Sequence, residues 1–253
     1  MTNLITNRVP IIVLSYWIIK IAATTLGETG ADLFSMTLHL GYATASVIFM
    51  AIFLVLLLIK LSMKRYDPIV YWLVFTATSI VGTAMSDYMD RTLSLGYAMG
   101  SMILITGLLA TLGVWYYKEK SISVENITTS RAEIFYWTAF LFANTLGTAA
   151  GDFLADDAGL GFAGGAALIG GLLVLTTLLH YYTKVSTIFL FWVAFVLTRP
   201  FGATFGDSLT KPIEQAGLDL GTLGSSAVFA ALLIVFVFFE HKSHHAKKNA
   251  LIS

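Results

Sequence analysis

The sequence predicts an all-α membrane protein in which eight transmembrane helices form four helical hairpins. Its composition is too apolar for a soluble domain, because 57% of the 253 residues are hydrophobic, only 12% are charged and the mean hydropathy is +0.80. A motif of Trp, Gly ten residues later and Asp fifteen residues later occurs four times at fixed spacing. The copies are Trp17/Gly27/Asp32, Trp72/Gly82/Asp87, Trp137/Gly147/Asp152 and Trp192/Gly202/Asp207.

Eight apolar runs have the roughly 20 residues that a helix needs to cross a bilayer. They cover residues 10–31, 40–62, 68–86, 94–117, 132–151, 160–182, 186–206 and 220–239. Odd-numbered runs begin with the Trp and end near the Asp, and even-numbered runs begin at a Leu-Gly-aromatic element such as Leu40-Gly41-Tyr42. The repeat is therefore predicted to be a two-helix hairpin.

One transmembrane domain, residues 1–253, accounts for the whole chain. The predicted repeats cover residues 10–62, 68–117, 132–183 and 186–239, and a basic, histidine-rich tail follows at 240–253. The first run carries the repeat motif, so we interpret it as a retained span and not as a cleaved signal peptide.

The charged residues of the loops predict the orientation of the chain. Lysines and arginines gather at the N-terminus, in the even-to-odd loops such as 60–65 and 118–131, and in the tail. Because positive loops stay in the cytoplasm, both termini are predicted to be cytoplasmic. An even number of spans per repeat makes all four copies parallel, and a pseudo-fourfold or two-plus-two ring is the natural packing.

A polar stripe runs along each odd span. Residues four and eight before the Asp share roughly one helical face with it. The four stripes are Thr24-Glu28-Asp32, Ser79-Thr83-Asp87, Asn144-Thr148-Asp152 and Arg199-Ala203-Asp207. One turn further toward the cytoplasm stand Lys20, Phe75, Phe140 and Phe195. We expect a polar outer half that closes onto an aromatic constriction.

Small residues four apart accompany each stripe. They are Gly27 with Ala31, Gly82 with Ser86, Gly147 with Gly151, and Gly202 with Gly206. Such spacing lets helix backbones approach closely in lipid, which places the odd spans in an inner ring. We interpret these glycines as packing residues; the alternative is a broken helix that offers carbonyl ligands.

The four aspartates need compensation, because a carboxylate in the last turn of a helix faces the negative end of its dipole. A cation, protonation, or Arg and Lys would supply it. The alternatives are solvation at the outer mouth or capping of a short following helix. Glu28 and the four Asp carry −5, and Lys20 and Arg199 carry +2. Arg91 and Lys211 are predicted to be solvated loop charges.

These residues define the predicted ion pathway. It comprises Glu28, Asp32, Thr83, Asp87, Asn144, Thr148, Asp152, Asp207, Lys20 and Arg199, with Asp32, Asp87, Asp152 and Asp207 as metal ligands. An excess of carboxylates on a converging axis attracts cations. Lys20 could instead reach the cytoplasmic interface, and Arg199 could be a purely structural partner of a carboxylate.

Several other chemistries are excluded or weaker. Zero net charge excludes a basic nucleic-acid footprint, and the absence of cysteine excludes disulfides, thiolate sites and iron–sulfur clusters. No pair of histidines has the mid-span placement that haem ligation requires. The Trp and Tyr residues that open the odd spans are predicted to form an aromatic belt at the cytoplasmic interface.

The aromatic-Trp, Gly-x-x-x-small-Asp and Leu-Gly-aromatic elements resemble those of the bacterial "uncharacterised membrane-anchored proteins", which are built from a repeat of unknown function. The resemblance covers residues 10–240. It implies a multi-span protein of the bacterial inner membrane with four tandem hairpins, and it implies no reaction or substrate. The fourth copy departs from the pattern at Phe191, Pro200 and Ala203 and in an insertion that begins at Lys211.

The function expected from these residues is that of a cation transporter or channel. Carboxylates, hydroxyls and one amide suit a hard divalent cation of the Mg²⁺ or Mn²⁺ class. We expect no enzymatic activity, no cofactor other than such a bound cation, and no nucleic-acid partner. The lipid bilayer and a small cation are the expected partners, and a homo-oligomer is compatible with the sequence. The alternative is a membrane sensor or assembly partner in which the charges form an internal salt-bridge network.

Overall fold

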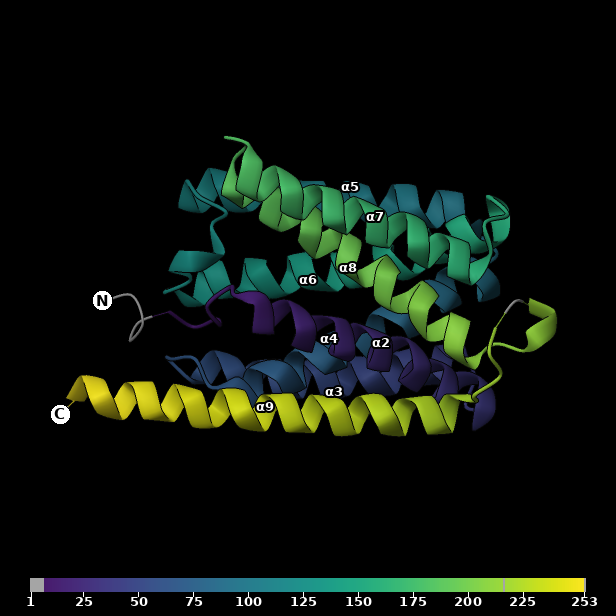
Figure 1. Ribbon diagram of the computed structural model, residues 1–253, viewed down its shortest axis with the longest axis horizontal. Coiled ribbons are helices and arrows are strands. Elements are labelled where there is room, and N and C mark those ends of the chain that lie inside the picture. Colours follow the sequence, from purple (N-terminus) through teal and green to yellow (C-terminus); the bar gives the residue numbers. More distant parts are fainter. Residues whose placement is uncertain (1–6, 216, 253) are drawn as a thin grey trace.

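The computed structural model describes residues 7–215 and 217–252, and within them every regular element is helical (Figure 1). The eight α-helices are α2 (Leu14–Asp32), α3 (Tyr42–Ser62), α4 (Pro68–Asp87), α5 (Gly96–Glu119), α6 (Ser130–Asp152), α7 (Gly161–Tyr182), α8 (Thr187–Thr210) and α9 (Thr222–Ile252). The all-α prediction is confirmed. Of the residues predicted to form a separate tail, 240–252 continue α9 as helix, and 253 lies outside the described residues.

The four Trp-to-Asp helices form an inner ring. Helix α2 packs on α4, α4 on α6, α6 on α8, and α8 returns to α2. Helices α5 and α7 lie along one side of this ring, and α3 and α9 lie along the other (Figure 1). Burial separates the two layers, since 67% of the most apolar stretch of α4 is buried and only 17% of that of α9.

Each outer helix packs mainly on the inner helix of the following repeat. Helix α3 packs on α4, α5 on α6 and α7 on α8, and α9 closes the bundle by packing on α2. This differs from the predicted hairpins, in which an inner helix would pack on the outer helix that follows it. Short loops, residues 63–67 and 183–186, hold α3 beside α4 and α7 beside α8.

A wide π-helical turn follows the Asp in the first three repeats. These turns are η1 (Leu33–Thr37), η2 (Tyr88–Thr92) and η4 (Phe153–Asp157). The preceding Asp makes no capping hydrogen bond to its turn, so capping does not account for the carboxylates. The fourth repeat lacks this turn, and its insertion contains the short 3-10 helix η5 (Ile213–Gln215) instead.

Residues 7–13 and the C-terminal end of α9 lie at one end of the bundle (Figure 1). We call it the terminal end, and the opposite end is the Asp end. A buried charge cluster anchors the N-terminal segment there. Glu133 of α6 lies 2.9 Å from Arg8 Nη1 and 2.6 Å from Lys60 Nζ of α3. Its full burial makes these two partners necessary, since an unpaired buried charge is costly.

The predicted aromatic belt is wrong for three of the four tryptophans, which are buried, whereas Trp17 is partly exposed. Trp72 and Trp137 are at most 1% exposed, and Trp192 is 6% exposed. The Tyr71 and Tyr136 hydroxyls lie 2.6 Å apart within the same cluster. These rings start inner helices, which the outer helices cover, so they pack against one another and not against lipid headgroups.

Six helices are long and apolar enough to cross a membrane: α3, α4, α5, α7, α8 and α9. Helices α2 and α6 are outside this set. Both carry several charged or amide side chains, including Lys20, Glu28 and Asn144, which are buried in the ring. Neighbouring helices therefore cover the polarity of α2 and α6.

The first glycine of each motif stands where two inner helices meet. It faces the polar residue eight positions before the Asp of the next repeat, so Gly27 faces Ser79, Gly82 faces Asn144, Gly147 faces Arg199 and Gly202 faces Thr24. A Cβ atom at Gly82 would lie 3.0 Å from the backbone of Asn144. A methyl group at any of these four glycines would therefore require the facing residue to shift.

The second glycine of the third and fourth motifs has more room. A Cβ atom at Gly151 would lie 3.3 Å from Cγ2 of Thr204, and one at Gly206 would lie 3.2 Å from Cβ of Glu28. Both glycines face the next inner helix, but they meet side chains there and not the closest backbone. The tightest contact therefore lies one turn earlier, at the first glycine of each motif.

The alternative of a broken helix at these glycines is wrong. Helix α6 remains α-helical through Gly147 and Gly151, and α8 remains α-helical through Gly202 and Gly206. Backbone carbonyls within a continuous helix accept its own hydrogen bonds. The paired glycines therefore act in helix packing.

We predict that Gly82→Ala lowers the unfolding temperature of the protein in detergent. The added methyl group meets backbone atoms that cannot rotate away, and such overpacking costs about 1–3 kcal/mol. Gly113→Ala on α5 is the matched control, because nothing lies within 4 Å of a Cβ atom there. Equal tolerance of the two substitutions would contradict the close packing of the inner ring.

Candidate functional site

Arg199 of α8 lies at the centre of the inner ring and is fully buried. Its Nη1 and Nη2 each donate to Oε2 of Glu28 on α2 at 3.2 Å. Nη2 also donates to the Thr148 hydroxyl of α6 at 2.8 Å and to the Thr83 hydroxyl of α4. One side chain thereby joins all four inner helices.

The same hydroxyls complete the environment of Glu28. Thr83 and Thr148 donate to Glu28 Oε2 at 3.2 and 3.3 Å. Glu28, Thr83 and Thr148 each stand four residues before the Asp of their repeat, and α8 has Ala203 at that position. Ala203 offers no polar group at this level, and the guanidinium of Arg199 reaches the hydroxyls from one turn earlier on the same helix. We call this group the central cluster: Arg199, Glu28, Thr83 and Thr148.

The four Asp carboxylates are buried at the Asp end, and each is 2–3% exposed. Arg91 lies 3.0 Å from Asp87 of its own repeat and 3.2 Å from Asp152 of the next. Lys211 lies 3.2 Å from Asp207 of its own repeat and 2.7 Å from Asp32. Each cation thus bridges two repeats and compensates two carboxylates.

The prediction that Arg91 and Lys211 are solvated loop charges is wrong. Their side chains are only 33% and 13% exposed. Both stand four residues after the Asp of their repeat, a spacing at which helical side chains pair, and this signal was available in the sequence. Burial alone would lower the pKa of Lys211, but the carboxylates of Asp207 and Asp32 outweigh it and raise the pKa above its usual value.

Charge at this end of the polar core remains negative. Glu28 and the four Asp carry −5 when ionised, and Arg199, Arg91 and Lys211 carry +3, which leaves −2. Lys20 adds nothing to this neutralisation, because it lies apart from these carboxylates. The predicted counterion Lys20 is therefore wrong, and the Asp residues pair with Arg91 and Lys211 instead.

Three of the carboxylates form a compact group: Glu28, Asp32 and Asp207. One oxygen from each lies within 4.8 Å of the others, and all three side chains are buried. Asp207 Oδ1 has no hydrogen-bond partner, and Lys211 Nζ at 3.2 Å pairs with it by charge alone. Asp87 and Asp152, which were predicted as ligands of the same ion, are not in this group. We call the group the three-carboxylate cluster.

Lys20 is fully buried, so it does not reach the interface. Its Nζ donates to the Phe195 carbonyl at 2.8 Å and to the Thr198 hydroxyl, and it lies 3.9 Å from the centre of the Phe195 ring. Asn144 is also outside the central cluster. Its amide donates to Thr78 at 2.8 Å between α4 and α6.

Aromatic rings close the polar core toward the terminal end. Phe75 and Phe140 have ring centres 5.6 Å apart, and those of Phe140 and Phe195 are 3.9 Å apart. All three side chains are fully buried. The expected aromatic constriction below the polar stripe is present in the structure.

Fold and site together define a helical protein of internal repeats, compatible with a multi-pass membrane protein, whose buried core carries paired charges. The chain belongs to the family described as Repeat of Unknown Function (DUF347), whose model matches residues 15–66, 70–121, 135–186 and 190–246. Four matches confirm the predicted resemblance to a family built of four copies of such a repeat. No curated protein matches the chain, and no solved structure matches it.

We predict that Arg199→Met strongly lowers the free energy of unfolding. It leaves the buried Glu28 without its cation, and breaking a buried pair costs about 3–5 kcal/mol. The double variant Glu28→Gln/Arg199→Met removes both charges and should recover much of the loss. Thermal unfolding in detergent measures both effects.

The control is Arg131→Gln, because Arg131 is 70% exposed and lies 3.9 Å from Glu119. Such surface pairs contribute about 0–1 kcal/mol. A loss for Arg199→Met no larger than that for Arg131→Gln would show that the central cluster does not hold the ring together.

Proposed function

We propose that the protein is a membrane carrier for a hard divalent cation of the Mg²⁺ or Mn²⁺ class, bound by the three-carboxylate cluster. The observation that carries the proposal is the approach of Glu28, Asp32 and Asp207 within 4.8 Å in a buried site. Carboxylate oxygens are the ligands that these ions prefer. Glu28, Asp32 and Asp207 carry −3 when ionised, and their partners Arg199 and Lys211 carry +2, so a charge of −1 remains at the site and attracts a cation.

Lys211 is the internal competitor in this proposal. Its ammonium group pairs with Asp32 and Asp207, two of the three proposed ligands. An entering cation therefore displaces Lys211, which is 13% exposed and can turn toward the solvent at the Asp end. This exchange keeps the carboxylates compensated when the ion is absent.

The central cluster and the aromatic constriction favour a carrier over an open channel. Arg199 occupies the axis beside Glu28, and the Phe75, Phe140 and Phe195 rings follow it toward the terminal end. An ion at the three-carboxylate cluster is thus accessible from the Asp end alone. Passage to the other side then requires the inner helices to rearrange, as in alternating access.

In the proposed topology all eight helices cross the membrane and both termini are cytoplasmic. The basic loops support this orientation, and the resemblance described above favours the bacterial inner membrane. We expect reporter fusions at Ser123 and Asp157 to lie on opposite sides of the membrane. Reporters on the same side would contradict the topology.

We predict that Lys211→Gln strengthens the stabilisation of purified protein by Mn²⁺ or Mg²⁺, because it removes the competitor from Asp32 and Asp207. Arg91→Gln is the matched control, since it frees Asp87 and Asp152, which lie outside the three-carboxylate cluster. Asp207→Asn should abolish the effect. Unfolding temperatures measured over a series of metal concentrations give the apparent affinities.

Transport itself is tested with the protein in sealed liposomes that contain a metal-sensitive dye. Wild-type protein should admit Mn²⁺, and Asp207→Asn should admit it several-fold more slowly at equal reconstitution. No Mn²⁺ or Mg²⁺ flux by folded wild-type protein, together with no metal-dependent stabilisation, would contradict the proposed function.

A second candidate is a membrane sensor or assembly partner that transports nothing. It is favoured by the pairing of every Asp in the ring with Arg91 or Lys211, which leaves none of the four without a cation. In this case Lys211→Gln and Arg91→Gln would both destabilise the protein, and neither would alter its response to metal.

A further inference from the structure

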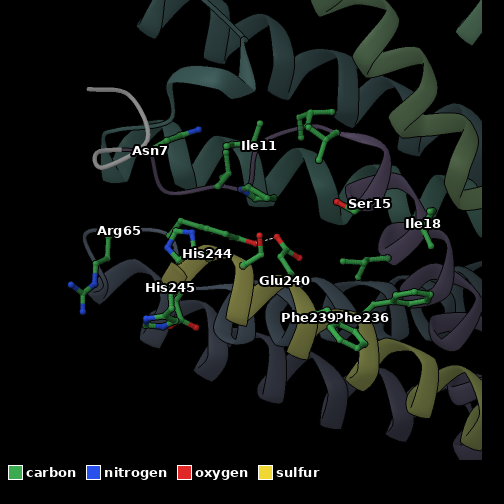
Figure 2. Close-up of a pocket in the computed structure, with 18 of the residues that line it drawn as sticks. Asn7, Ile11, Ser15, Ile18, Arg65, Phe236, Phe239, Glu240, His244 and His245 are labelled. Carbon is green, nitrogen blue, oxygen red and sulfur yellow. Dashed lines mark hydrogen bonds between the residues drawn. The ribbon is translucent and has the colours of Figure 1, made fainter. Parts of the chain in front are cut away.

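A cavity of about 810 Å³ lies at the terminal end of the bundle, between the N-terminal segment and α9 (Figure 2). The N-terminal segment and the start of α2 form one wall with Ile11, Ser15 and Ile18, and α9 forms the other with Phe236 and Phe239. Its size is in the range of pockets that bind small organic molecules, about 300–1,000 Å³.

The apolar walls of the cavity are open to the surroundings. Ile11, Ile18 and Phe239 are 53%, 43% and 63% exposed. Both flanking helices run along the bundle beside other apolar, exposed side chains of α9 such as Ile234 and Val235. With the protein in a bilayer, the cavity is therefore accessible to an amphiphile from the lipid.

A carboxylate lies between these walls. Glu240 of α9 accepts hydrogen bonds from the Tyr66 hydroxyl at 2.5 Å and from the Trp72 indole N–H at 2.7 Å. Both donors are neutral, and together they orient the carboxylate. Among the described residues, Glu240 forms no ion pair with a lysine or arginine.

Acidic side chains outnumber lysines and arginines among the described residues that line the cavity. Asp67 and Glu125 line it as well, and Arg65 is the one arginine among the described lining residues. The guanidinium of Arg65 points away from Glu240 (Figure 2). His244 stacks its ring edge-on against Tyr66, with ring centres 5.3 Å apart. An anionic headgroup would therefore be disfavoured.

We propose that this cavity binds an amphiphilic organic cation, with its charge at Glu240 and its apolar body between α2 and α9. Charge complementarity selects the cation, and the faces of Phe236 and Phe239 add cation–π attraction and apolar contact area. The site shares no residue with the three-carboxylate cluster, so it stands independently of the proposed cation transport.

The test uses tetraphenylphosphonium and tetraphenylborate, which have nearly the same shape and opposite charge. Binding of radiolabelled tetraphenylphosphonium is measured with the full-length protein in lipid nanodiscs. Wild-type protein should bind it saturably, and unlabelled tetraphenylborate should not compete. Glu240→Gln should weaken binding at least tenfold, because it keeps an acceptor oxygen but removes the charge.

Glu119→Gln is the matched control, since Glu119 is at the same end of the bundle but does not line the cavity. It should bind as wild type does, and so should Asp207→Asn, which separates this site from the proposed carrier site. If the Glu240→Gln protein does not fold, the Ile18→Trp variant tests the proposal instead. It fills the cavity from an exposed position and should also weaken binding at least tenfold.

Three results would overturn the proposal. One is the absence of saturable binding by wild-type protein. Another is equal binding of the phosphonium and the borate. The third is unchanged phosphonium binding by folded Glu240→Gln or Ile18→Trp protein.

Discussion

The ion pair between Arg199 and Glu28 is the interaction on which the rest of the core depends. Two opposite charges are removed from water in the middle of an apolar bundle, and their attraction repays this only if the remaining donors and acceptors are also satisfied. The Thr83 and Thr148 hydroxyls meet that condition from the two other inner helices. The register of all four helices is thereby tied to one guanidinium. The glycines make this geometry reachable, because Gly147 faces Arg199 itself and Gly206 faces Glu28 at the neighbouring interface.

The four repeats share the same helix packing, but their charged residues differ from copy to copy. The first glycine of the motif is present in every copy, and it produces a ring in which each inner helix meets the next in the same way. Cations follow the Asp at four residues only in the second and fourth copies, where Arg91 and Lys211 stand. Glu28 occurs only in the first copy and Arg199 only in the fourth. The polar core is therefore two-plus-two at the Asp end and asymmetric at its centre, and this asymmetry brings Glu28, Asp32 and Asp207 together on one side.

Sequence spacing was sufficient for the helices, the inner ring and the aromatic constriction, because these depend on periodicity and on residue size. It was insufficient for the partners of the carboxylates. Arg91 and Lys211 were predicted to be solvated because they follow the apolar runs. The π-helical turn η2 keeps Arg91 near the Asp residues, and α8, which extends to Thr210, does the same for Lys211. The packing of each outer helix on the next inner helix could not be predicted either, because a hydrophobic run does not indicate which neighbouring helix it packs against. The buried tryptophans were misassigned for the same reason.

The account rests on the exchange of Lys211 for a bound cation at Glu28, Asp32 and Asp207. The most direct measurement is an experimental structure of protein crystallised with Mn²⁺, with anomalous scattering recorded at the manganese edge. The account predicts an anomalous peak within coordination distance of oxygens from all three carboxylates, with the Lys211 side chain moved away from Asp32 and Asp207. At saturating Mn²⁺, Lys211 still bridging Asp32 and Asp207 with no peak between the three carboxylates would contradict it.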